Sequence, residues 1–255
     1  MKIATWNVNS IRARTERVIP WLEANRPDVL CMQELKVEED KFPMELFTAI
    51  GYEVVLTAQK TYNGVAIASL KKASDVRIGL GDGVEDPQAR LISAVVDGVR
   101  IASIYVPNGQ AVGSDKFEYK MQWMDRLRRW LDTQHDRQEP LALCGDFNVA
   151  PEAKDVHDPV AWEKETLFHI DARKALENVR AWGLVDLFRL HHHEGGIYSW
   201  WDYQMLAFPK GRGLRIDHIF ASESLARRCD SCVIDREARK GLKPSDHAPV
   251  IATFT

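Results

Sequence analysis

The chain alternates short apolar runs with longer segments of mixed character. The apolar runs are rich in β-branched residues, and several are almost continuously apolar, which is typical of strands buried on both faces. We therefore predict strands over residues 2–8, 28–34, 52–57, 64–70, 90–97, 99–106, 141–147, 215–222 and 249–255.

Three segments between these strands carry apolar residues three or four positions apart, which predicts amphipathic helices. The segments are 10–26, 114–134 and 171–188. Ser10 is a candidate N-cap of the first helix, and Ser114 or Asp115 of the second, because short polar side chains accept hydrogen bonds from the first backbone N–H groups of a helix. Gly183 is expected to stop the third helix.

The connections between the predicted strands are of two kinds. Asp97-Gly98 lies between two strands and is a strong signal for a tight antiparallel hairpin. Strand–helix–strand segments instead favour parallel neighbours, so the mixture predicts an α/β protein with mixed sheets rather than a purely parallel, doubly wound one. No linker or low-complexity stretch interrupts the chain, so we expect a single domain over residues 1–255, and the similar strand ends TWNVNS and GDFNVA hint at two related halves.

Composition and charge narrow the classes of function. The 255 residues are 45% hydrophobic, which is enough for a sizeable core, and the formal net charge is −3. This balance excludes a generic polycation that coats nucleic acid. Binding to DNA would need a local basic patch, with metal ions offsetting any carboxylates near the phosphate.

The cysteines, the start of the chain and the lengths of the apolar runs indicate the cellular compartment of the protein. Cys31 and Cys144 lie in apolar strands and are expected to be buried free thiols, while Cys229 and Cys232 lack the second pair of ligands that a zinc site needs. The chain begins directly with a strand, and no apolar stretch approaches the roughly 20 residues of a membrane span. We expect a soluble, cytoplasmic protein without membrane association.

Polar residues gather where strands begin or end. An unpartnered buried carboxylate costs several kcal/mol, whereas Mg²⁺ prefers oxygen ligands from one or two carboxylates. This set therefore indicates a metal-binding site at the ends of the strands. Its members are Asn7, Glu34, Tyr105, Asp146, Asn148, Asp217, Asp246 and His247.

Each of these residues also has a purely structural interpretation. Glu34 could pair with Lys36 at the surface, and Asp146 and Asp246 could stabilise turns. Asp217 is harder to explain in this way, because it lies inside an apolar strand. Asn148 is two residues beyond Asp146, so in an extended chain both side chains would face one ligand. The three histidines 191–193 lie in a loop without flanking ligands and are expected to be solvated.

Six blocks carry a resemblance to a known family. TWNVNSIR, MQELK, YVPNG, GDFNVAP, RIDHI and SDHAPV, in this order and spacing, resemble the exonuclease III family of Mg²⁺-dependent DNA-repair nucleases. The resemblance implies a four-layer α/β sandwich, in which two mixed β-sheets pack face to face with helices on the outside and the site lies at one edge. It also implies cleavage 5′ to abasic sites in double-stranded DNA, removal of nucleotides and blocking groups from 3′ ends, and Mg²⁺ as cofactor, with Mn²⁺ as a substitute.

The resemblance assigns roles to the polar set. Glu34 looks like the principal metal ligand, and Asp146 resembles the residue that orients or deprotonates the attacking water. His247 would donate to the scissile phosphate with Asp217 fixing its ring, and Tyr105 would contact the phosphate or the leaving oxygen. Asn148 would donate to a phosphate oxygen or hold the water, and Asp246 would hold a second metal position. The implied metal-site residues are Asn7, Glu34, Asp146, Asn148, Asp246 and His247.

Substrate contacts follow from the same resemblance. Trp200 and Leu214 match positions that line a pocket for a sugar without its base, although some relatives have tryptophan at position 214. Asn9 stands where some relatives place an aspartate near the metal, and Asn108 is a candidate contact to the DNA backbone. The candidate phosphate contacts are Arg90, Lys210, Arg212 and Arg215.

Two other interpretations remain at this point. The first is a different phosphodiesterase of the same superfamily, such as a secreted DNase, a phosphoinositide phosphatase or a sphingomyelinase. The DNase-type site resembles one with a histidine in place of Tyr105, usually with a leader and disulfides. The second is an inactive DNA-binding relative, a class that tends to lose the metal-site carboxylates. We expect a monomer, because no assembly seam is apparent.

Overall fold

Two six-stranded sheets form the centre of the computed structural model, which describes all 255 residues. One sheet has the order β11 (Cys229–Ile234), β12 (Val250–Phe254), β1 (Lys2–Asn7), β2 (Val29–Gln33), β4 (Val65–Ser69) and β3 (Glu53–Thr57). The other has the order β5 (Ser74–Ile78), β6 (Leu91–Val96), β7 (Val99–Tyr105), β8 (Leu141–Asp146), β10 (Asp217–Ser222) and β9 (Leu184–Asp186).

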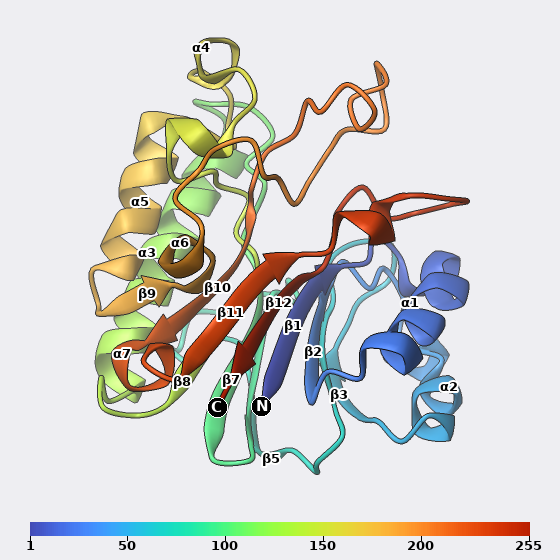
Figure 1. The fold of residues 1–255 in the computed structure, drawn as a ribbon. Coiled ribbons are helices and arrows are strands. Elements are labelled where there is room, and N and C mark those ends of the chain that lie inside the picture. The colour runs from blue at the N-terminus through green and yellow to red at the C-terminus, as the bar shows by residue number, and fades with distance from the viewer.

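Helices cover the outer faces of both sheets, which gives the four layers that the resemblance implied (Figure 1). On one side lie α1 (Ile11–Asn25) and α2 (Met44–Ala49), and on the other lie α3 (Asp115–Gln134) and α5 (Ile170–Arg180). The remaining turns of helix are α4 (Pro159–Trp162), α6 (Leu187–His191), α7 (Glu223–Ala226), η1 (Glu39–Lys41), η2 (Ala153–Asp155) and η3 (Arg236–Arg239). None of the helices has the length and apolar character that crossing a membrane requires.

Three apolar clusters hold the layers together. The cluster between the sheets takes residues from both, including Ile3 and Cys31 on one side and Ile101 and Cys144 on the other. A second cluster packs α3 and α5 against their sheet, and a third packs α1 and α2 against theirs. Cys31 and Cys144 are buried and free, as predicted. The mixed-sheet α/β sandwich is therefore confirmed.

Each sheet contains a single parallel pair of strands, and these two pairs position the site. β1 and β2 are parallel and joined through α1, while β7 and β8 are parallel and joined through α3. All other neighbours are antiparallel. Because parallel strands end at the same edge of a sheet, residues that follow these strands meet at the upper edge of the molecule in Figure 1.

The structure confirms two of the local features predicted from the sequence, a turn and a helix N-cap, and contradicts a second N-cap. The Asp97-Gly98 turn joins β6 and β7, with φ of 53° and 78°, and Ser114 accepts a hydrogen bond from Phe117 N at 3.2 Å, so both predictions are confirmed. The N-cap predicted at Ser10 was wrong: its side chain makes no capping hydrogen bond, because the backbone there turns to φ 83° and Ser10 N donates to Glu34 O.

The third predicted helix is shorter than the segment 171–188. α5 ends at Arg180, and the chain turns at Gly183 with φ 122°. The residues beyond the glycine form the edge strand β9 and the separate helix α6. Apolar spacing alone did not reveal this break in the segment, although the glycine marked its place.

A buried ionic network lies beside the start of β10. Arg215 is fully buried, and it donates to Asp155 Oδ1 at 2.6 Å and to Asp186 Oδ2 at 2.9 Å. His218 Nδ1 lies 3.0 Å from Arg215 Nη1, and His218 Nε2 lies 2.9 Å from Val149 O. The interpretation of Arg215 as a phosphate contact was therefore wrong, because its guanidinium is enclosed and paired with two carboxylates.

This network predicts a loss of stability in acid. Burial raises the pKa of Asp186, but the charge of Arg215 outweighs it and lowers that pKa to about 2. Since the folded-state pKa lies below the ordinary value of about 3.9, the pair stabilises the fold above that value, and about 2 kcal/mol is lost as the pH falls from about 4 to about 2. Urea unfolding at several pH values should show this loss. Asp186→Asn should be less stable at pH 6 and show a flatter acid profile, and identical slopes for both proteins would contradict the assignment.

Candidate active site

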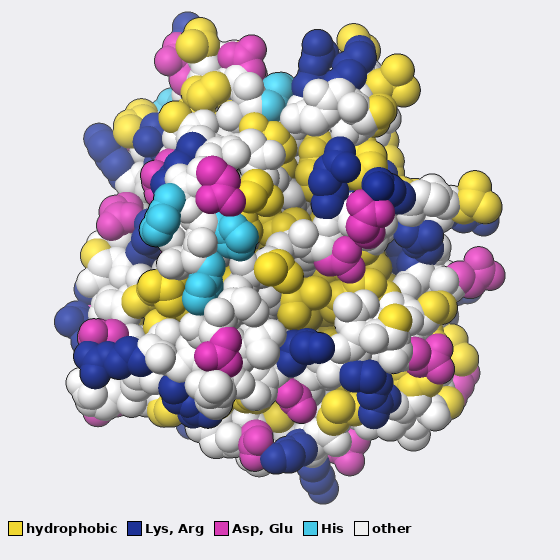
Figure 2. Space-filling model, in the orientation of Figure 1, with side chains coloured by type: hydrophobic (Ala, Val, Ile, Leu, Met, Phe, Trp, Pro, Cys, Tyr) yellow, Lys and Arg dark blue, Asp and Glu magenta, His cyan; other side chains and the backbone are white.

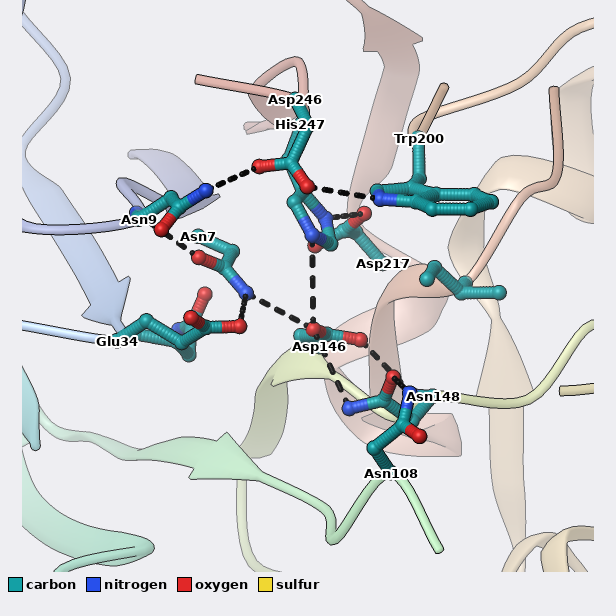
Figure 3. Close-up of polar contacts among 12 residues, drawn as sticks. Asn7, Asn9, Glu34, Asn108, Asp146, Asn148, Trp200, Asp217, Asp246 and His247 are labelled. Atoms are coloured by element: carbon teal, nitrogen blue, oxygen red, sulfur yellow. Dashed lines mark hydrogen bonds and ion pairs between the residues drawn. The ribbon is translucent and has the colours of Figure 1, made fainter. Parts of the chain in front are cut away.

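Asn7 links carboxylates from both sheets. Its Nδ2 donates to Glu34 Oε1 at 2.8 Å and to Asp146 Oδ2 at 2.9 Å, and its Oδ1 accepts from Asn9 N at 3.0 Å (Figure 3). Asn7 and Asp146 are almost completely buried. One amide group therefore fixes the spacing of two acidic side chains that lie more than a hundred positions apart in the sequence.

Left-handed backbone turns place the residues that follow the parallel strands. Asn9, Glu34 and Asn148 have φ of 45°, 53° and 50°. Residues other than glycine adopt this conformation infrequently, and such residues cluster at binding and catalytic sites. In each case the chain turns immediately beyond a strand, so the side chain stays at the edge of the sheet.

His247 lies between two carboxylates. Its Nδ1 is 2.9 Å from Asp217 Oδ2, and its Nε2 is 3.8 Å from Asp146 Oδ2. Burial lowers the pKa of His247, but the charges of Asp217 and then Asp146 outweigh it and raise that pKa to about 10. The ring is therefore an imidazolium at neutral pH, with Nδ1–H donating to Asp217 and Nε2–H free for an anion.

The two central carboxylates differ in their protonation. Burial raises the pKa of Asp146, and the nearby charges of Asp217 and Glu34 raise it further, against the opposing effect of His247. Burial also raises the pKa of Glu34, but Lys36, at 2.7 Å from Glu34 Oε2, lowers it below its ordinary value. Glu34 is thus a fixed negative charge, whereas Asp146 accepts a proton readily.

Tyr105 ends β7 beside Asp146. Burial and the charges of Glu34 and Asp146 raise the pKa of its phenol far above the ordinary value. The Arg90 guanidinium lies 4.8 Å from the centre of the Tyr105 ring and donates to Tyr105 O at 3.2 Å. The phenol therefore keeps its proton and can act as a hydrogen-bond donor.

The side chains fit a divalent cation. Glu34 and Asp146 each offer a carboxylate oxygen within 4.8 Å of the other, and a His247 ring nitrogen lies within the same distance of both. Because the protonated His247 ring has no free lone pair, the two carboxylates are the candidate ligands. Asp217 Oδ1 is buried without a hydrogen-bond partner. Two carboxylates converging on one point repel each other unless a cation lies between them. Asp246 lies outside this group, and its two oxygens accept from Asn9 Nδ2 at 2.8 Å and from Trp200 Nε1 at 3.0 Å.

Comparison with known proteins identifies the family. Residues 4–247 match the model of the endonuclease/exonuclease/phosphatase family. The chain belongs to this family. Exodeoxyribonuclease III of Haemophilus influenzae is 33% identical over 266 aligned positions, covering all of both chains. The family match and these relatives together confirm the resemblance to the exonuclease III family. They also confirm the expectation of a DNA-repair phosphodiesterase.

Two solved structures are also similar to the chain over its full length. An AP endonuclease from Archaeoglobus fulgidus superposes with a TM-score of 0.97 and 46% identity, covering 100% of this chain and 99% of that one. The 3′ phosphatase NExo from Neisseria, bound to a product DNA hairpin, gives a TM-score of 0.95 and 43% identity over the same shares. One of these two similar proteins is thus named as an AP endonuclease and the other as a 3′ phosphatase.

Asn148 and Asn108 form an amide pair next to Asp146. Asn108 Nδ2 donates to Asn148 Oδ1 at 3.1 Å, and Asn148 Nδ2 donates to Val106 O at 2.9 Å. Asn148 N donates to Asp146 Oδ1 at 2.9 Å, so the turn interpretation of Asp146 is also correct. The argument from an extended chain was wrong, because the backbone at Asn148 is left-handed, yet the side chain still lies beside Asp146.

Two of the residues expected to contact substrate in this endonuclease/exonuclease/phosphatase protein are already engaged with neighbours. Asn9 accepts from Lys36 Nζ at 2.6 Å while its amide donates to Asp246. Leu214 is fully buried in an apolar cluster, and its backbone pairs with that of Trp200, so it does not line a pocket. The pocket role expected for Leu214 was therefore wrong.

Of the other substrate candidates, Asn108, Lys210 and Arg212 are exposed, whereas Arg90 is buried and donates to Gln88 and to the backbone of Tyr105. Arg90 and Asn108 border a hollow of about 640 Å³ that begins at Tyr105. Lys210 and Arg212 are exposed on the loop that follows Trp201, and Figure 2 shows Lys and Arg side chains gathered over that loop at the upper right. The local basic patch that DNA binding requires is therefore present at the rim of the site, despite the net negative charge.

Two side chains near the site were not among the residues predicted from the sequence. Trp162 on α4 packs edge-on against Trp200, with ring centres 6.1 Å apart. Lys120 on α3 is fully buried and donates to three backbone carbonyls, two of which belong to Asn108 and Asn148. A signal for Lys120 existed, because it follows Phe117 by three positions on the apolar stripe of its helix.

Proposed function

We propose that this protein is a Mg²⁺-dependent DNA-repair phosphodiesterase that cleaves 5′ to abasic sites in double-stranded DNA and removes nucleotides and blocking groups from 3′ ends. The observation that carries this proposal is the convergence of Glu34 and Asp146 on Asn7, with the protonated ring of His247 opposite them. Because the side chains of the site come from one chain, we propose that the monomer is active.

Glu34 and Asp146 would hold the metal ion, with Asn7 fixing the distance between them. Their oxygen atoms suit Mg²⁺, and Mn²⁺ has similar ligand preferences. When bound, the cation neutralises the negative charge that makes a phosphodiester resist attack. Asp246 accepts hydrogen bonds from Asn9 and Trp200, so we assign it to the support of those two residues, and its expected part in a second metal position stays a prediction.

The protein side chains bind the phosphate, accept the proton of the attacking water and stabilise the leaving oxygen. His247 Nε2–H donates a charge-assisted hydrogen bond to a non-bridging oxygen of the phosphate, while Asp217 holds Nδ1–H. Asp146 accepts a proton from the attacking water while the water oxygen forms its bond to phosphorus. Tyr105 keeps its proton and donates a hydrogen bond to the leaving oxygen. As its bond to phosphorus breaks, the leaving oxygen takes a proton from solvent water.

Relative rates on three duplexes test this function. The substrates carry an internal abasic site, a 3′-phosphate end or a recessed normal 3′ end, and all are assayed with Mg²⁺. We expect cleavage of the first and trimming of the other two by the same purified protein. Absence of hydrolysis on all three, with a folded protein and Mg²⁺ or Mn²⁺ present, would contradict the proposal.

Trp200 is expected to favour the abasic substrate. Its ring lies next to Asp246 and 6.5 Å from the ring of His247, the residue that we propose donates to the phosphate. Trp200→Ala should lower abasic cleavage about 10-fold more than 3′-phosphate removal, because an exposed sugar gains more than a phosphate from an apolar wall. Trp200→Phe keeps the ring without the N–H and serves as the control. Equal losses on both substrates would count against this role.

A further inference from the structure

Lys120 lies at a junction of three loops beneath the candidate site. Its side chain is 0% exposed, and its Nζ donates to Asn148 O at 2.7 Å, Thr166 O at 2.9 Å and Asn108 O at 3.1 Å. The three carbonyls come from the loop after β7, the loop after β8 and the segment between α4 and α5. An ammonium group has three N–H donors, so every donor of Lys120 has a partner.

Burying this charge works against stability, which calls for an explanation. Lys120 occupies the apolar face of α3 together with Phe117 and Leu127, where an apolar side chain of similar size would avoid the loss of hydration. No carboxylate pairs with the ammonium; backbone carbonyls alone satisfy it. The arrangement therefore fixes loop backbone rather than forming an ordinary ion pair.

The loop after β7 is shaped to receive the lysine. Gly109 has φ 94°, and a Cβ at this position would lie 3.1 Å from Lys120 Cδ and 3.2 Å from Phe117 Cδ2. Any larger residue would crowd the lysine stem and would also adopt a left-handed conformation that favours glycine. The chain next to Asn108 thus approaches α3 closely enough for the ammonium to reach the carbonyl of Asn108.

The carbonyls that Lys120 holds belong to the two residues of the amide pair. Asn108 and Asn148 are joined by a hydrogen bond between their side chains, and Asn148 also contacts Asp146 through its backbone N–H. Lys120 holds their backbone carbonyls. Their side-chain amides face the site (Figure 3). A shift in either backbone would therefore move the amides relative to Asp146.

We propose that Lys120 is a positioning residue that acts through Asn108 and Asn148 and sets the geometry in which the phosphate is attacked. This inference rests on the proposed function, since it concerns the same site. It adds a residue from the buried face of a helix, which touches neither the metal position nor the substrate. Lys120 is expected to affect the rate of the chemical step far more than the affinity for DNA.

The first experiment compares Lys120→Met with the wild-type protein on the abasic duplex. Methionine fills the space of the lysine stem but leaves three carbonyls without donors. We expect kcat to fall about 10- to 100-fold, while KM changes less than about 3-fold, because a 1 Å misplacement in an active site can cost about 100-fold. Leu127→Ala, on the same buried face of α3 and away from the loops, is the control and should lower Tm while keeping kcat.

A double-mutant comparison separates positioning from general loss of stability. If Lys120 acts through the amide pair, then Lys120→Met combined with Asn148→Ala should have about the same kcat as Asn148→Ala alone. Multiplication of the two single effects would overturn the proposal. If Lys120→Met fails to fold, Lys120→Gln replaces it in both comparisons, since its amide can still donate to two of the carbonyls and should retain an intermediate kcat.

These experiments distinguish a failure of the proposed nuclease function from a failure of the proposed role of Lys120. A wild-type protein that leaves the abasic duplex uncut would contradict the proposed function. A wild-type protein that cuts, with Lys120→Met or Lys120→Gln folded and equally fast, would overturn the role of Lys120 alone. Loss of kcat by Leu127→Ala to the same extent as by Lys120→Met, at a temperature where both are folded, would also overturn it.

Discussion

Asp146→Asn is expected to lower kcat on an abasic duplex by about 10²- to 10⁴-fold, the range for loss of a general base. Asparagine keeps the shape of the side chain and an oxygen that can accept from Asn148 N, but it cannot take a proton from water. Asp146 is held in place by the Asn148 N–H and is the group that we propose takes the proton, so its loss should lower the rate strongly. Single-turnover cleavage at saturating protein measures the effect directly.

The same variant should remain folded. Asp146 is buried with other negative charges nearby, and a neutral amide avoids the cost of that burial. His247 keeps its hydrogen bond to Asp217 in the absence of the Asp146 charge. A Tm close to that of the wild type, with the large fall in kcat, would assign the loss to chemistry. Undiminished cleavage by the purified variant would refute the assigned role.

Removal of divalent cations by EDTA is expected to abolish hydrolysis, and added Mg²⁺ or Mn²⁺ should restore it. Without a cation, Glu34 and Asp146 repel the phosphate that His247 attracts. Glu34→Gln should raise the Mg²⁺ concentration for half-maximal rate at least 10-fold, because it removes the fixed negative charge among the ligands. A titration of rate against Mg²⁺ for both proteins provides the comparison.

Thermal unfolding gives a second measurement that does not depend on turnover. A ligand that binds only the folded protein stabilises it, by about 2.7 kcal/mol at a hundred times its Kd. Mg²⁺ should therefore raise the Tm of the wild-type protein, and the rise should shrink or vanish in Glu34→Gln. Lys36→Met, which removes the ion pair to Glu34 without removing the ligand, should keep the rise. Rapid hydrolysis in excess EDTA would exclude the metal from the reaction.

The central strands of the fold could be predicted because they are apolar on both faces. Three of the four edge strands could not: all residues of β5 are exposed, β9 has three residues, and β11 alternates without a clear apolar face. Such strands are defined by hydrogen bonds to a neighbour in space rather than by their own composition. The Asp-Gly hairpin and the Ser114 cap were predictable because both act within a few residues.

For the site, too, the features that lie within short stretches of sequence could be predicted, and the contacts between distant segments could not. Polar residues at the ends of strands could be found in the sequence, and the six family blocks ordered them. The sequence did not show that Asn7 joins Glu34 to Asp146, since this depends on how the two sheets face each other. Leu214 and Arg215 were misplaced for a related reason, because only the tertiary structure reveals that they are enclosed.

The bridge made by Asn7 has a consequence for the nascent or damaged protein. Glu34 belongs to one sheet and Asp146 and Asp217 to the other, while His247 at the end of the chain completes the cluster. A truncated chain, or one whose layers have come apart, would lack the assembled site. Nuclease action is thereby limited to molecules that have finished folding.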